Sequence, residues 1–66
     1  MRVKFTTCFR AEGDKLYILP NVRVGWITAK AEVEVDHFGG ISWREFIGRD
    51  LEVVDRDGDT VIKGIY

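Results

Sequence analysis

The sequence predicts a mainly β protein, a small five-stranded curved sheet or barrel with one short helix between the third and fourth strands. Three observations indicate this class. Apolar and polar residues alternate along much of the chain, which is the period of a half-buried strand. The pair Asp57-Gly58 separates two apolar stretches, as in a tight hairpin. Only one segment, ISWREFIG, has helical spacing together with helical end signals.

The chain has 66 residues, which is enough for a single domain over residues 1–66. Apolar residues make up 45% of it, so a packed core is expected rather than disorder. A domain of this size buries only about 60% of its unfolded surface, so its stability depends on good packing or on a partner. Cys8 is the only cysteine, which excludes an internal disulfide and a zinc site built on several thiolates.

No apolar run approaches the length of a membrane span, and the N-terminus lacks the apolar centre of a signal peptide. A lone thiol without an export signal is typical of a reducing compartment. We therefore expect a complete, small cytoplasmic protein with no membrane segment.

The first two strands are expected at residues 2–9 and 15–20. In RVKFTTCF, Val3, Phe5, Thr7 and Phe9 share one face, while Cys8 falls on the other face with the charged residues. A glycine-containing turn, RAEGD, follows. KLYILP then ends at Pro20, because proline cannot donate to a strand ladder.

The third stretch, residues 21–38, changes phase at Gly25-Trp26. Val22 and Val24 share the parity of Trp26, whereas the apolar residues after it have the opposite parity. A flat strand would expose one of these two sets. A bulge at Gly25, a sharp bend there, or a break into two strands would each resolve the conflict.

A helix of one to two turns is predicted from residue 42. Ser42 and Glu45 form a capping box, and Ile41 with Phe46 forms a hydrophobic staple. Gly48 supplies the stop. We expect three aromatic residues to anchor the core: Trp26, Trp43 and Phe46.

The segment DRDGDT, residues 55–60, allows two interpretations. Its alternating aspartates resemble the start of a calcium loop, but Thr60 stands where that loop needs glycine and Tyr66 where it needs a bidentate glutamate. Asp57-Gly58 is instead typical of a type I′ hairpin turn. We therefore predict a hairpin and no metal.

A turn centred there sets a register. It places Val53 opposite Ile62 and Val54 opposite Val61, and it pairs Glu52 with Lys63 as an ion pair across the strands. Leu51, Val53 and Ile62 are expected in the core. The opposite face is a candidate contact patch, which consists of Val54, Val61, Glu52 and Lys63.

Three architectures fit this order of elements. It resembles the five-stranded barrels of the OB type, which carry a helix between strands three and four. SH3-like barrels have a similar size but place a helical turn before the last strand. An open curved sheet is the third option. All remain open from the sequence alone.

The composition argues against catalysis. The chain has one Cys, one Ser and one His, and Ser42 is accounted for as a cap, so only a Cys8–His37 dyad is left for nucleophilic chemistry. We expect no enzyme activity and no cofactor. The leading prediction is protein–protein interaction through free strand edges, in the manner of phage or mobile-element inhibitors of a host factor, with homo-oligomerisation as a related outcome.

Binding of single-stranded nucleic acid is the alternative. The net charge is −1 and the signs are mixed, so no basic block marks such a site. A sheet face can still combine aromatic and basic side chains for this purpose. The candidates are Lys4, Lys15, Tyr17, Arg23 and Trp26.

Overall fold

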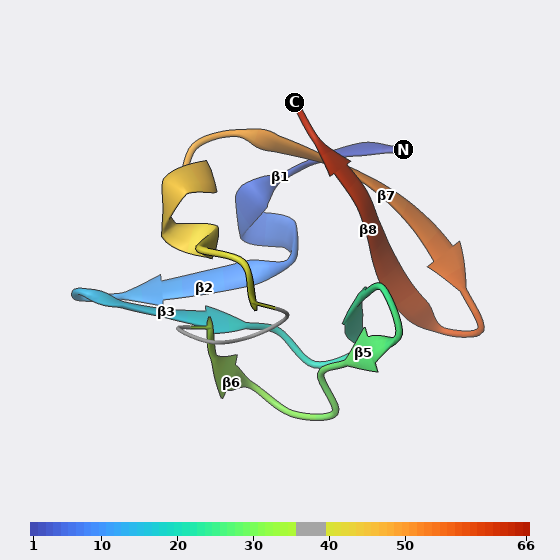
Figure 1. Ribbon diagram of the computed structural model, residues 1–66, viewed down its shortest axis with the longest axis horizontal. Coiled ribbons are helices and arrows are strands. Elements are labelled where there is room, and N and C mark those ends of the chain that lie inside the picture. Colours follow the sequence, from blue (N-terminus) through green and yellow to red (C-terminus); the bar gives the residue numbers. More distant parts are fainter. Residues whose placement is uncertain (36–39) are drawn as a thin grey trace.

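The computed structural model describes residues 1–35 and 40–66. They form a mainly β domain of two sheets rather than one (Figure 1). The larger sheet has the strand order β1-β7-β8-β4-β5. Its strands are β1 (Arg2–Lys4), β7 (Asp50–Arg56), β8 (Asp59–Ile65), β4 (Val22–Val24) and β5 (Ile27–Thr28).

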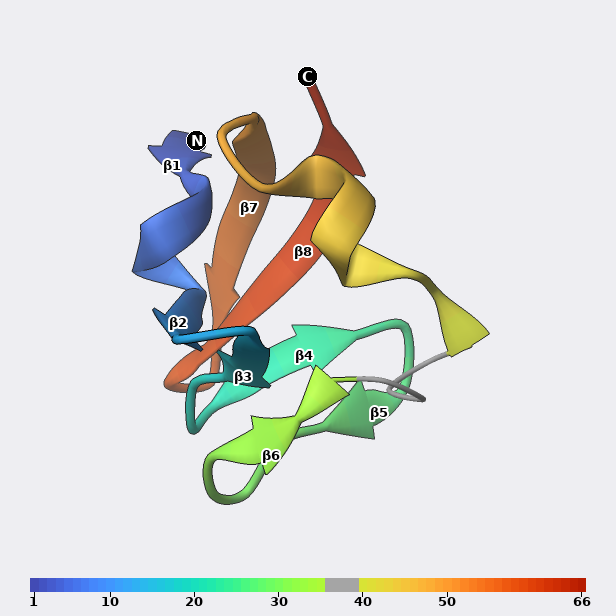
Figure 2. The same ribbon diagram turned by 90° about the vertical axis from the view of Figure 1, so that its left-hand side faces the viewer.

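The smaller sheet has the order β2-β3-β6, and both of its pairings are antiparallel. Its strands are β2 (Phe9–Glu12), β3 (Lys15–Ile18) and β6 (Val33–Glu34). Short 3₁₀ turns complete the described elements, η1 (Phe5–Thr7) and η3 (Trp43–Phe46). The β2–β3 hairpin lies across the domain from β7 and β8, and the two 3₁₀ turns lie beside it (Figures 1 and 2).

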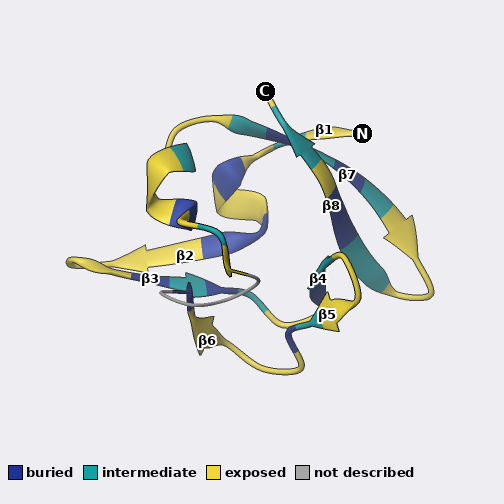
Figure 3. Ribbon diagram, in the orientation of Figure 1, coloured by how far each residue is buried: buried dark blue, intermediate teal, exposed yellow. Residues whose placement is uncertain are grey.

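The core lies between these layers (Figure 3). Its centre is a run of aromatic rings: Phe5 stacks on Phe9 at 4.4 Å between centroids, and Phe9 contacts Trp43 at 5.0 Å. Phe46 meets the edge of Trp43 at 5.9 Å. The predicted anchoring roles of Trp43 and Phe46 therefore hold, with Trp43 only 2% exposed.

The fold class is confirmed only at the coarse level. In the residues that the structure describes, the chain is mainly β, but the sheets do not close into a barrel. One reason that the sheets stay open is that the first predicted strand is not continuous. After β1 the chain makes the 3₁₀ turn η1, and it then enters the other sheet as β2.

This turn also changes the phase of the side chains. Phe5 and Phe9 are buried as expected, but Cys8, predicted on the polar face, is fully buried. The Cys8 amide donates to the Phe5 carbonyl at 3.1 Å, which is the three-residue spacing of a 3₁₀ turn. Strand periodicity therefore fails across η1.

The predicted helix from residue 42 is also only a 3₁₀ turn. The Glu45 amide donates to the Ser42 carbonyl at 3.2 Å, and the Ser42 side chain makes no capping hydrogen bond. Ile47 already has φ −57° and ψ 129°, outside the helical region. A segment this short gains too few α-helical bonds to offset nucleation, and the docking of Trp43 decides its shape.

The phase change at Gly25 is a break into two strands, one of the three expected solutions. Gly25 and Trp26 form a two-residue turn between β4 and β5, with Gly25 at φ +61°. A glycine with positive φ at the first turn position is the signature of a type II′ hairpin. Trp26 at the second position is 90% exposed, so its predicted place in the core is wrong.

The hairpin at Asp57-Gly58 is confirmed. Both residues have positive φ, 54° and 84°, as a type I′ turn requires. The predicted pairs next to the turn are also correct, Val54 with Val61 and Val53 with Ile62.

The register changes farther from the turn. Glu52 lies opposite Gly64, not Lys63, because an irregularity between Glu52 and Val53 leaves one extra residue in β8. This extra residue turns the side chains after Lys63 to the faces of the sheet opposite to those that the predicted register gives them. Ile65 consequently packs against the same core as Ile62. The predicted Glu52–Lys63 pair is therefore wrong, because the bulge moves Lys63 out of register with Glu52 while it turns the partly buried Ile65 toward the core.

Candidate binding surfaces

The most exposed large apolar side chain among the described residues is that of Trp26. It lies at the tip of the β4–β5 hairpin, beside Ile27, which is 42% exposed. A shallow depression of about 220 Å³ lies around it, lined by Val24, Gly25, Trp26 and Ile27. Arg23 holds the turn from one side, since its Nε donates to the Gly25 carbonyl at 3.0 Å.

The sequence contains a signal for this exposed position of Trp26, although the residue was predicted in the core. A glycine followed by one residue, between two alternating stretches, is itself a hairpin signal. At such a turn the side chain after the glycine projects away from the sheet. Trp26 is left in water for this reason, and it contributes little to the core.

The predicted nucleic-acid face is divided between the two sheets. Lys4 belongs to β1 at one edge of the larger sheet, while Arg23 and Trp26 belong to the β4–β5 hairpin at its other end. Lys15 and Tyr17 belong to β3 in the smaller sheet. The fold therefore separates the five residues into three places, which are β1, β3 and the β4–β5 hairpin.

Tyr17 has charged neighbours of both signs. The Arg10 guanidinium lies over its ring at 4.7 Å from the centroid. Arg10 is in turn bound by the carboxylates of Glu12 and Glu32, and Tyr17 lies opposite Glu34 in the β3–β6 ladder. The cation of this cluster is thus already neutralised by acidic side chains.

The predicted contact patch on the last hairpin is smaller than expected. Val61 is only 5% exposed, while Val54 is half-buried. Lys63 is exposed and has no ion-pair partner among the described residues. Glu52 is instead bound by the Met1 amino group and by the Tyr66 hydroxyl.

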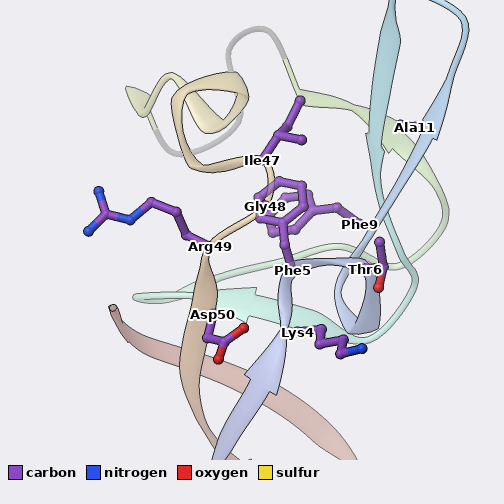
Figure 4. A pocket seen from close by; sticks show the side chains of 9 residues that line it. All are labelled: Lys4, Phe5, Thr6, Phe9, Ala11, Ile47, Gly48, Arg49 and Asp50. Atoms are coloured by element: carbon purple, nitrogen blue, oxygen red, sulfur yellow. The ribbon is translucent and has the colours of Figure 1, made fainter.

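A larger cavity of about 250 Å³ lies between η1 and the segment that leads into β7 (Figure 4). The rings of Phe5 and Phe9 form its inner wall, and Ile47, 54% exposed, stands at its mouth. Its complete lining is Lys4, Phe5, Thr6, Phe9, Ala11, Ile47, Gly48, Arg49 and Asp50. No pattern in the sequence predicted this cavity, because its walls come from residues more than 30 positions apart.

The electrostatics of its mouth are simple. Asp50 accepts a hydrogen bond from Arg2 Nε at 2.7 Å, so its charge is matched. Arg49 points away from the aromatic rings, and its Nε donates to the Tyr66 main-chain oxygen (Figure 4). Lys4 makes no ion pair with any described residue.

Cys8, the candidate nucleophile, is fully buried, and burial raises the pKa of its thiol to about 11. Its proposed partner His37 lies outside the described residues. Within residues 1–35 and 40–66, no three His, Cys, Asp or Glu side chains gather as they would around a metal ion.

The described segments contain no helix with the length and apolarity needed to cross a membrane. No family model, curated protein or solved structure matches this chain. The exposed Trp26 and the apolar cavity are the two surface features that suggest binding.

Proposed function

We propose that this protein is a non-catalytic binding module that contacts another protein through the tip of its β4–β5 hairpin. The observation that carries the proposal is the 90% exposure of Trp26, with Ile27 exposed beside it. Tryptophan is among the residues most enriched at energetically dominant positions of protein interfaces. Next to it lies β5, the edge strand of the larger sheet among the described strands.

The energetic argument rests on the size of the indole. A buried tryptophan removes 150–250 Å² from water, which corresponds to roughly 4–6 kcal/mol before the costs of association. The isolated domain gains almost none of this, because the side chain is already solvated. A partner that covers Trp26 would gain most of it, so the residue is more useful for binding than for folding.

The edge of the sheet supports the same surface. β5 is the last strand in the order β1-β7-β8-β4-β5, and within residues 1–35 and 40–66 it pairs only with β4. The outer side of such a strand offers main-chain groups to a partner strand, while neighbouring side chains give specificity. Trp26 immediately precedes β5 and would lie at the end of an added strand.

The test uses immobilised protein and lysate from the native host. Trp26→Ala should abolish recovery of the partner, whereas Val33→Ala should not. Val33 is the matched control because it is also apolar and exposed, at 43%, but lies in the other sheet. Equal recovery with all three proteins, or no recovery with the native chain, would contradict the proposal.

A second candidate is binding of single-stranded nucleic acid, which is supported by a cation, Arg23, bound to the turn that carries the exposed Trp26. Fluorescence titration with an oligonucleotide tests it. Trp43 is buried, so quenching of long-wavelength emission reports Trp26. Binding that weakens steeply with salt and requires both Arg23 and Trp26 would favour this candidate over a protein partner.

A further inference from the structure

We infer that the cavity between η1 and the start of β7 is a second binding site, which receives one bulky apolar side chain from an acidic segment of a protein partner. The inference rests on the proposed function in one respect, that the occupant belongs to a protein. It concerns a different surface from the Trp26 tip, and it assigns the chemistry of what binds there.

The size and lining of the cavity define the apolar part of the occupant. A volume of about 250 Å³ lies below the roughly 300–1,000 Å³ of pockets that enclose drug-sized molecules. Phe5, Phe9 and Ala11 line it, and Ile47 stands at the mouth. It therefore suits a single aromatic or branched aliphatic side chain.

The inner wall is rigid before anything binds. Phe5 and Phe9 are 4% and 1% exposed, and their rings stack with an angle of 12° between planes. Phe9 also contacts Trp43 in the core. A pocket whose wall is part of the core loses little conformational entropy on binding, which favours affinity.

Charge defines the polar part of the occupant. Asp50 is matched by Arg2, so the acidic group at the mouth is already compensated. Lys4 lines the same mouth and has no ion-pair partner among the described residues, whereas Arg49 points away and donates to the Tyr66 main-chain oxygen. The uncompensated charge is positive, so a carboxylate next to the apolar side chain would be attracted.

The experiment is a titration of the amide-labelled full chain, followed by NMR, with the peptide acetyl-Asp-Phe-Asp-amide. Shifts should concentrate on the amides of Ala11 and Gly48, which line the cavity. Acetyl-Asp-Ala-Asp-amide should bind at least about tenfold more weakly, because it lacks the buried ring. Acetyl-Asn-Phe-Asn-amide should bind about two- to fivefold more weakly, as expected for an exposed ion pair.

Two protein variants test whether Lys4 causes the preference for the acidic peptide. Lys4→Gln should remove the preference for Asp over Asn peptides, whereas Lys63→Gln, at an exposed lysine outside the cavity, should keep it. Equal binding of all three peptides, or shifts away from the cavity, would overturn the inference. If phenylacetate bound as tightly as the peptide, a free small acid would be enough to fill the cavity. The inference that the occupant belongs to a protein would then be overturned.

The peptide experiment and the test of the proposed function can fail independently of each other. Peptide binding at the cavity does not involve Trp26, and capture through Trp26 does not involve Lys4. Failure of the peptides with Trp26-dependent capture intact removes only this inference. Loss of Trp26-dependent capture with peptide binding intact removes only the hairpin-tip surface.

Discussion

The Tyr66 hydroxyl donates a hydrogen bond to Glu52 Oε1 at 2.5 Å, which ties the end of β8 to the middle of β7. The Met1 amino group binds the other oxygen of the same carboxylate. The bulge places Glu52 opposite Gly64. The two chain ends of this domain thus meet at one carboxylate.

The first prediction concerns the stability of the fold at low pH. The bond from the Met1 amino group, and then that from Tyr66, lower the pKa of Glu52 below its ordinary value of 4.5. Folding therefore favours the ionised form, and this stabilisation is present above pH 4.5 and is lost as the pH falls through the lower, folded value. Glu52→Gln should reduce the melting temperature at pH 6 but have little effect near pH 2.

The control for this experiment is Glu34→Gln, at an exposed carboxylate for which the structure shows no hydrogen bond or ion pair among the described residues. It should leave the pH profile unchanged. If Glu52→Gln lowered the melting temperature by the same amount at every pH, the charge of the carboxylate would not be what stabilises the fold.

The second prediction concerns the ionisation of Tyr66 at high pH. Its hydrogen bond to Glu52 raises the pKa of Tyr66, although the Arg2 guanidinium 4.2 Å from the ring centroid opposes the shift. The protonated form is favoured by folding, so this stabilisation is present below about pH 10 and is lost as the pH rises through the folded value. Ultraviolet titration of a Tyr17→Phe variant leaves Tyr66 as the single phenol. Ionisation at or below pH 10 would contradict the hydrogen bond.

A pair of glycine substitutions should isolate the effect of backbone conformation. Gly58→Ala places an L residue at φ +84°, whereas the φ of Gly64 is not in the left-handed region. A Cβ at either position meets no atom within 4 Å, so steric crowding does not distinguish them. Gly58→Ala should lower the free energy of unfolding by about 1–2 kcal/mol. Gly64→Ala should be neutral or slightly stabilising in urea unfolding.

The two tryptophans should behave oppositely. Trp43→Ala removes a side chain that is 2% exposed and touches Phe9 and Phe46, so it should cost about 3–5 kcal/mol. Trp26→Ala, at 90% exposure, should change the free energy of unfolding by less than about 0.5 kcal/mol. Urea unfolding followed by circular dichroism measures both. A large loss for Trp26→Ala would place that residue in the fold rather than at an interface.

The Cys8 thiol should be inert in the native protein. It is fully buried, and desolvation raises its pKa to about 11, so folding favours the protonated thiol. Labelling by Ellman's reagent at pH 8 should be slow and should accelerate on adding urea. The same shift makes stability fall once the pH rises above about 9. Rapid labelling under native conditions would contradict this burial.

Local features were the most predictable part of this protein. The turn at Asp57-Gly58 and the pairs Val53–Ile62 and Val54–Val61 depend on a few adjacent residues, and both were evident from the sequence. The break at Gly25 was among the expected solutions for the same reason. The candidate sites were less predictable, because the cavity joins η1 to the residues before β7, which no local pattern connects.

The sequence by itself determined the β class, the tight turns and part of the core, because hydrophobic periodicity and turn residues act over short distances. The tertiary structure decided which strands became neighbours, including the parallel pairing of β4 with β8. It also decided the interruption at η1 and the bulge near Glu52. Each of these depends on burying side chains from distant segments in one small core, and that requirement overrides local preference.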